Sequence, residues 1–143
     1  MQNLILIGYG KMGNAHRRTI EKSTKSDLIG IVDPQFANNN SEQGIKCYSD
    51  LSEIDFDDSN IDGAIVASST NSHYEIVKTL LLNKIPVLVE KPVTVKITEL
   101  DELIKISKES STIMRVGFIE LYNPVIDHAG KLIDENINNI NIS

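Results

Sequence analysis

Three glycines near the N-terminus follow one another at short, regular intervals. Gly8, Gly10 and Gly13 form a G-x-G-x-x-G pattern directly after an apolar run and at the start of a segment with helical spacing. In this arrangement the first glycine permits a tight turn, the second lets a pyrophosphate approach the backbone, and the third lets the helix pack closely on the strand. The N–H groups at the start of the helix would then bind the phosphates. The pattern predicts a dinucleotide-binding turn that also includes Lys11 and Met12.

Asp33 lies about 20 residues after the last of these glycines, at the end of a second apolar run. A carboxylate at this place accepts hydrogen bonds from the ribose hydroxyls of adenosine and repels a 2′-phosphate. We therefore expect NAD, with NADP less favoured, because Pro34 and Gln35 supply no arginine for a 2′-phosphate. A P-loop is excluded because Met12 stands where a Ser or Thr would bind magnesium. An S-adenosylmethionine-dependent methyltransferase would share the glycine turn and the acid.

The segments around these residues alternate between two kinds of pattern. Short apolar runs, typical of strands that are buried on both faces, occupy residues 4–7, 28–32, 63–67, 87–89 and 113–116. Segments with helical spacing occupy residues 12–21, 73–83 and 97–108. The alternation predicts crossover connections, and hence an α/β fold with a doubly wound parallel sheet, the Rossmann fold. Residues 33–43 predict only a shortened helix or a loop before a short run at 45–48.

The composition is that of a globular protein with an acidic excess. The chain of 143 residues has 14 Lys plus Arg against 20 Asp plus Glu, a formal net charge of −6, which disfavours a nucleic acid as the main partner. No apolar run approaches the ~18 residues of a membrane span, and the first strand-like run leaves no room for a signal peptide. We therefore expect a cytoplasmic protein. We expect no metal site, and we interpret His16 and His128 as ordinary helix residues, because no partner ligand stands at metal spacing.

Four further motifs follow the glycine turn in a fixed order. They are ASSTNSH (residues 67–73), EKP (90–92), VGF (116–118) and ELYNP (120–124). Together with the glycine turn, these motifs resemble the N-terminal half of the Gfo/Idh/MocA oxidoreductases, the family of glucose-fructose oxidoreductase and inositol dehydrogenase. The resemblance covers almost the whole chain, and EKP is its most specific element.

The resemblance implies that Lys91, the lysine of EKP, is the catalytic residue of this chain. In the family this lysine lies beside the nicotinamide and the reacting carbinol. An ammonium group there can hydrogen-bond the substrate oxygen, stabilise developing negative charge and help to relay a proton. A lysine before a proline with no such motifs around it would be a solvated strand end. Glu90 is expected to orient Lys91 or its loop and, with Lys91, to border the cofactor.

The loop of residues 67–73 corresponds to the family's Thr-Pro-x-x-x-His loop, which lines the cofactor groove at the start of a helix. This correspondence implies cofactor contacts for Ser68, Ser69, Asn71 and His73. The chain has two serines where the family has Thr-Pro, so the loop lacks its stiffening proline. For His73, a hydrogen bond to its own loop is an equally good interpretation.

A further departure from the family concerns substrate binding. Leu121 stands where the family often has an arginine, which removes a cationic contact near the cofactor or substrate. With Glu120 before it, the motif is similar to that of family members that oxidise nucleotide-linked amino sugars. The resemblance therefore implies a small sugar-type substrate, either free or linked to a nucleotide.

Members of the family are longer than this chain and have a second, α+β domain with the substrate pocket, an Asp-x-x-x-His acid/base pair and most of the oligomer interface. Nothing in this sequence matches that pair. We therefore expect residues 1–122 to form a single NAD(P)-binding Rossmann domain. Residues 123–143 are expected to form a connecting helix and the truncated start of the second domain, with 136–143 as an unpaired strand.

Two functions follow as hypotheses. In the first, the chain is the NAD-binding part of an oxidoreductase that transfers hydride between a nicotinamide cofactor and a carbinol of a sugar or sugar derivative. It would have little activity alone, because positioning of the substrate by a second wall is missing. In the second, it is a stand-alone dinucleotide-binding or redox-sensing module without catalysis. For the chain as a whole, the expected partners are a small sugar-type substrate and either a second domain or another copy of the chain.

Overall fold

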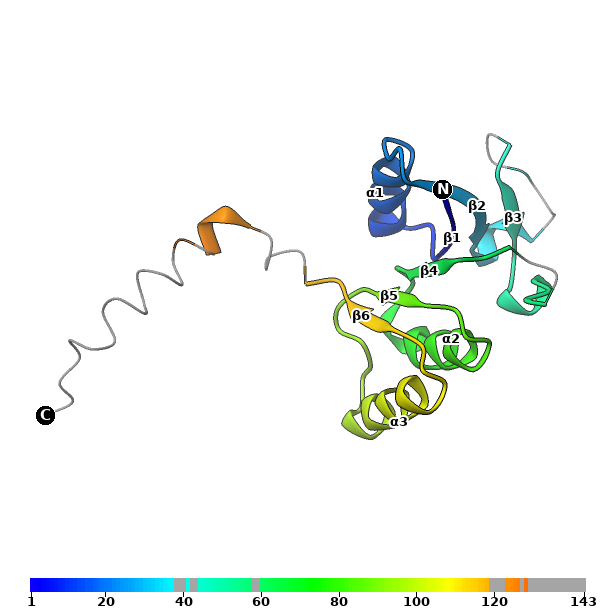
Figure 1. The fold of residues 1–143 in the computed structure, drawn as a ribbon. Helices are drawn as coiled ribbons and strands as arrows, with labels where there is room; N and C mark the ends of the chain where they lie inside the picture. The colour runs from blue at the N-terminus through cyan, green and yellow to red at the C-terminus, as the bar shows by residue number, and fades with distance from the viewer. Residues whose placement is uncertain (38–40, 42–43, 58–59, 119–122, 127, 129–143) are drawn as a thin grey trace, which may run out of the picture.

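The computed structural model of the chain describes residues 1–37, 41, 44–57, 60–118, 123–126 and 128. Its strands form one parallel sheet with helices on both faces (Figure 1). The strands are β1 (Gln2–Ile7), β2 (Ser26–Val32), β3 (Lys46–Tyr48), β4 (Gly63–Val66), β5 (Val87–Val89) and β6 (Met114–Val116). The α-helices are α1 (Lys11–Ile20), α2 (Thr70–Leu82) and α3 (Ile97–Glu109), and two short 3-10 helices are η1 (Pro34–Phe36) and η2 (Leu51–Glu53).

The central strands alternate their side chains between two apolar layers. In β1, Ile5 and Ile7 join the large core cluster beneath α2 and α3. Leu6, between them, packs in a second cluster with Ile20 of α1. Figure 1 accordingly shows α1 on one side of the sheet and α2 and α3 on the other. Burial on both faces explains why these strands have continuous apolar sequences.

The strand order is β3-β2-β1-β4-β5-β6. The chain moves outward from β1 to β3 and then returns to the other side of β1, where β4 begins the second half of the sheet. The connections after β1 and β4 therefore leave the sheet in opposite directions. Such a switch point leaves a crevice at the carboxyl ends of the strands. The predicted doubly wound α/β fold is confirmed.

The segment between β2 and β3 begins with one short turn of helix. Pro34 is the first residue of η1, and the Asp33 side chain caps this turn by accepting from the N–H of Gln35. This agrees with the predicted shortening of the helix in residues 33–43, part of which lies outside the described residues.

The last described residues include a short helical segment in the region that is predicted to connect to a second domain. Residues 124–126 are helical, and Asn123 Oδ1 accepts a 3.0 Å hydrogen bond from the N–H of Val125. The predicted continuation of this helix, the unpaired strand at 136–143, and Glu120 and Leu121 lie outside the described residues. None of the described helices has the length and apolar character needed to cross a bilayer.

Candidate functional site

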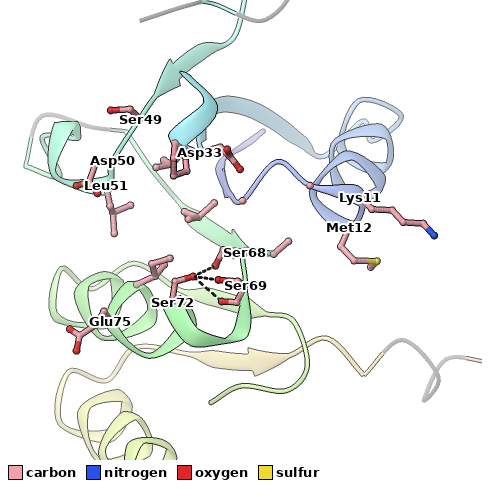
Figure 2. Close-up of a pocket in the computed structure, with 17 residues that line it drawn as sticks. Lys11, Met12, Asp33, Ser49, Asp50, Leu51, Ser68, Ser69, Ser72 and Glu75 are labelled. Carbon is pink, nitrogen blue, oxygen red and sulfur yellow. Dashed lines mark hydrogen bonds between the residues drawn. The ribbon is translucent and has the colours of Figure 1, made fainter. Parts of the chain in front are cut away.

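A groove of about 860 Å³ lies at the carboxyl ends of β1, β2 and β4, at the switch point of the sheet (Figure 2). It brings together residues from four connections that are distant in the sequence. Its lining comprises Ile7, Gly8, Gly10, Lys11, Met12, Val32, Asp33, Pro34, Ser49, Asp50, Leu51, Ala67, Ser68, Ser69, Ser72, Glu75 and Ile76. Most of the predicted glycine turn, Asp33 and part of the serine loop therefore share one groove, whereas Gly13, Glu90 and Lys91 are outside its lining.

Two glycines of the turn are required by close packing within the protein. Gly8 has a φ of +91°, and a Cβ there would come within 2.4 Å of the Ser68 backbone nitrogen. A Cβ on Gly13 would lie 2.0 Å from the carbonyl oxygen of Gly8. The turn after β1 therefore packs directly against both the start of α1 and the loop after β4.

Gly10 differs from these two glycines. Its backbone is extended, with φ −73° and ψ −160°, which any residue can adopt. A Cβ on Gly10 would meet no atom within 4 Å. Gly10 lines the groove and is the N-cap of α1, which has no side-chain cap. The open space and the N–H groups of the first helical turn fit a phosphate group that approaches the backbone.

The Asp33 carboxylate is fixed by two backbone N–H groups. Its Oδ2 accepts from Tyr9 at 2.7 Å, and its Oδ1 accepts from Gln35 at 3.0 Å. Each carboxylate oxygen has a second lone pair with which it can accept from another donor. The acid is therefore held between the glycine turn and η1, and it can still bind ligand hydroxyls.

Tyr9, inside the glycine turn, is held by side chains to which no sequence motif connects it. Its ring lies 5.6 Å from that of Phe36, and its hydroxyl accepts from the guanidinium of Arg17. Arg17 is buried in α1, and its Nε donates to Glu21 Oε1 at 2.7 Å. These contacts attach the turn to α1 and to η1.

The groove is predominantly acidic. Among the described residues that line it, Lys11 carries a positive charge, whereas Asp33, Asp50 and Glu75 carry carboxylates. The hydroxyl and the backbone N–H of Ser52 both donate to Asp50, and they hold the pKa of this carboxyl below its usual value. Asp50 was not predictable as a groove residue, because it belongs to no local motif.

Three serine hydroxyls meet on another wall of the groove, at the start of α2 (Figure 2). Ser72 Oγ lies 2.9 Å from Ser68 Oγ and 3.3 Å from Ser69 Oγ, and it is also 2.8 Å from the Ser69 carbonyl oxygen. Of the residues predicted in this loop, Ser68 and Ser69 line the groove. Asn71 is exposed outside the groove lining.

His73 lies beneath the serine loop and is 1% exposed. Its Nε2 is 3.1 Å from the Ser68 carbonyl oxygen, and its Nδ1 is 3.0 Å from that of Pro92. The ring therefore connects the loop after β4 to the loop after β5, and it is outside the groove lining. This placement matches the interpretation that His73 bonds its own loop.

Glu90 and Lys91 directly follow β5. The N–H of Glu90 donates to the Val66 carbonyl at 2.9 Å, whereas Lys91 is exposed and precedes Pro92 through a cis peptide bond. Glu90 is 8% exposed, and its Oε1 lies 2.7 Å from Nε2 of His16 on α1. This contact differs from the interpretation of His16 as an ordinary helix residue, because no local pattern connects it to position 90.

Comparisons with known proteins agree with this architecture. Residues 2–118 match the model of the Gfo/Idh/MocA family, described as an oxidoreductase family with an NAD-binding Rossmann fold. The myo-inositol 2-dehydrogenase of Thermotoga maritima is 30% identical over 117 residues, which cover 79% of this chain and 35% of that protein.

Two solved structures show the same fold. Myo-inositol 2-dehydrogenase from Lactobacillus plantarum has a TM-score of 0.81 at 25% identity, over 94% of this chain and 41% of that one. Scyllo-inositol dehydrogenase from Lactobacillus casei, solved with NAD(H) and scyllo-inositol, has a TM-score of 0.81 at 17% identity, over 95% of this chain and 42% of that one. The chain thus spans well under half the length of these relatives.

Proposed function

The chain belongs to the Gfo/Idh/MocA oxidoreductase family through its NAD-binding Rossmann fold, and we propose that it is the cofactor domain of a dehydrogenase that acts on a carbinol of a sugar or sugar derivative. The single observation that carries the proposal is the space over Gly10, which the packing of the protein itself does not explain. A phosphate needs such a space in order to reach the N–H groups of α1.

The adenosine end of the cofactor is proposed to lie at Asp33. Both carboxylate oxygens accept from backbone N–H groups, which fix the orientation of the negative charge. Ribose hydroxyls would donate to it, whereas a 2′-phosphate would meet a carboxylate. Asp50, on the same groove, adds a second negative charge. NAD is therefore the proposed cofactor, and NADP is less favoured.

The serine wall is proposed to border the middle of the cofactor. Ser68 and Ser69 present hydroxyls to the groove, and a hydroxyl can both donate to a phosphate oxygen and accept from a ribose. Asn71, which is exposed and does not line the groove, is also proposed to contact the cofactor. His73 is proposed to support the loop from below.

Lys91 is proposed as the catalytic residue. Bound NAD would supply the acceptor for the hydride. The exposed Lys91 ammonium would donate a hydrogen bond to the substrate oxygen and stabilise negative charge as the proton leaves. The position of Lys91 directly after β5, beyond the buried Glu90, supports this role.

The sugar-type substrate is proposed from the inositol dehydrogenases among the relatives. Because the chain spans only 35% of the Thermotoga enzyme, the remaining wall of the substrate site is assigned to a second domain. Residues 1–122 are proposed as the cofactor domain, and residues 123–143 as the connection to that second domain.

Calorimetric titration of the chain with NAD⁺, NADH and NADPH tests the proposal. NAD(H) is expected to bind, NADPH is expected to bind more weakly, and Asp33→Ala is expected to weaken NADH binding by about tenfold or more through the loss of charge-assisted hydrogen bonds. Asp27→Ala, an exposed acid at the far end of β2, is the matched control. Equal binding of NADH by the Asp33→Ala variant and the unaltered chain would contradict the proposal.

A further inference from the structure

We propose that His16 is a positioning residue for Lys91, and that it acts through Glu90. The proposal rests on the proposed function only in the role it gives to Lys91. Its structural basis is the 2.7 Å contact between His16 Nε2 and Glu90 Oε1. Both side chains are largely buried, with 19% and 10% exposed fractions.

The contact joins two parts of the fold that the sheet keeps apart. His16 is on α1, which follows β1, whereas Glu90 follows β5. In the sheet, β4 lies between β1 and β5. The His16 to Glu90 contact therefore passes over the end of β4 and connects the helix that starts at the glycine turn to the loop that carries Lys91.

Glu90 is confined on a second side by Gly117. A Cβ on Gly117 would lie 3.1 Å from Glu90 Oε1 and 3.2 Å from its Oε2. The Gly117 backbone is itself attached to the sheet, because its N–H donates to the Val89 carbonyl at 2.8 Å. The carboxylate is thus held between a ring on α1 and the backbone after β6, and it directly precedes Lys91 in the chain.

This confinement has an electrostatic consequence for Lys91. The imidazole N–H of His16 satisfies one oxygen of the Glu90 carboxylate and keeps it directed toward α1. Without His16, the carboxylate has lost this partner and is free to turn toward the adjacent ammonium of Lys91. A carboxylate beside an amine favours its protonated form. We therefore expect His16 to set both the orientation of the EKP turn and the reactivity of Lys91.

The test measures the acetylation rate of Lys91 in the ligand-free chain by quantitative mass spectrometry, with the exposed Lys84 in the same sample as the reference. In His16→Ala, Lys91 is expected to react about threefold more slowly, the size of an exposed charge–charge interaction. His16→Gln keeps an N–H donor and is expected to restore the rate. His128→Ala, which removes an exposed histidine, is the matched control.

A second comparison isolates the path through Glu90. Glu90→Gln keeps the volume beside Gly117 and removes the charge. In this background, His16→Ala is expected to leave the Lys91 rate unchanged, because the group through which it acts is gone. Thermal unfolding of every variant identifies any that fail to fold. If His16→Ala is unstable, His16→Leu, which fills the space of the ring without an N–H donor, takes its place in both backgrounds.

Three results would overturn the proposal. Lys91 could be acetylated at the wild-type rate in His16→Ala, or as slowly in His16→Gln as in His16→Ala. The third is an equal effect of His16→Ala on this rate in the wild-type and Glu90→Gln backgrounds. The proposed function is tested separately, by measuring NADH binding to the unaltered chain. A chain that fails to bind NADH and still shows the His16-dependent rate would retain the positioning role and lose the cofactor assignment.

Discussion

The backbone N–H of Tyr9 donates a 2.7 Å hydrogen bond to Asp33 Oδ2, so the acid at the end of β2 is attached to the glycine turn at the end of β1. The second oxygen of the same carboxylate accepts from Gln35. The charge proposed to select the cofactor therefore also shapes the turn proposed to bind its phosphates. A change at Asp33 is expected to affect both protein stability and binding.

Asp33→Asn provides a test of this double role. Tyr9 and Gln35 donate to different oxygens of Asp33, and an amide replaces one of these oxygens with a donor NH₂ group, so one of the two N–H groups would face a donor. One backbone N–H is left without its partner, and we expect the free energy of unfolding to fall by about 1–2 kcal/mol. NADH binding should weaken in the same variant. Urea denaturation and calorimetry measure the two effects, with Asp27→Asn as the control; unchanged stability would show that the two hydrogen bonds do not support the turn.

Gly10 and Gly13 are expected to respond differently to the same substitution. In Gly13→Ala the new Cβ would lie 2.0 Å from the Gly8 carbonyl oxygen, and we expect a loss of about 3 kcal/mol of stability. Gly10→Ala meets no atom within 4 Å, and we expect its stability to stay within about 1 kcal/mol. Its NADH affinity should nevertheless fall by about tenfold or more, because the methyl group occupies the space proposed for a phosphate.

Thermal unfolding and calorimetric titration separate the two glycine effects. Gly44→Ala is an unsuitable control, because Gly44 has a φ of +84° and an alanine there would itself strain the backbone. Ala15→Ser, at an exposed position on α1, is a better one. A Gly10→Ala variant that binds NADH as well as the unaltered chain would remove the observation on which the proposed function rests.

Arg17 is expected to stabilise the glycine turn through Tyr9. In Arg17→Met the buried guanidinium is lost, and the Tyr9 hydroxyl and Glu21 each lose a donor. We expect the free energy of unfolding to fall by about 2 kcal/mol, less than for a fully buried ion pair because Glu21 remains hydrated. Arg18→Met, at the exposed neighbouring position, should change little. Equal urea midpoints for the two variants would contradict this expectation.

Much of the fold was predictable because its strands are buried on both faces and have apolar sequences. The run at 87–89 coincides with β5, whereas α2 begins at Thr70, three residues before the predicted start. Its first turn, Thr70 to Ser72, is polar and carries no apolar periodicity, so the pattern became visible only at His73. Polar first turns are common because caps and free N–H groups face solvent.

The candidate site was predictable only where neighbouring residues form a motif. The glycine turn and Asp33 have a recognisable spacing, and the structure places them in one groove. The contact between His16 and Glu90 joins residues 74 positions apart, and neither has a local pattern that indicates the other. Such contacts depend on the strand order, which no local pattern reveals. In the order β1-β4-β5, only one strand separates β1, which α1 follows, from β5, which Glu90 follows.

A polar network between α2 and α3 is expected to make stability depend on pH. Tyr74 donates to Glu102 at 2.6 Å, and Lys78 donates to Glu102 at 2.7 Å. Both contacts hold the pKa of Glu102 below its ordinary value of 4.5, with the Lys78 hydrogen bond as the larger cause. A carboxyl whose folded pKa is lowered contributes stability above its unfolded pKa, and this contribution is lost as the pH falls through the folded pKa.

Glu102→Gln tests this dependence, because glutamine does not titrate. The unaltered chain is expected to have a higher melting temperature than the variant at neutral pH, and the difference should shrink as the pH falls below 4.5. The same contacts raise the pKa of Tyr74 and Lys78, so their contribution should be lost only in strong alkali. The difference should be small and salt-sensitive because the groups are exposed. Scanning calorimetry over this pH range, with Asp101→Asn on the same helix as the control, measures it; a difference that persists unchanged in acid would show that Glu102 is not stabilised by its charge.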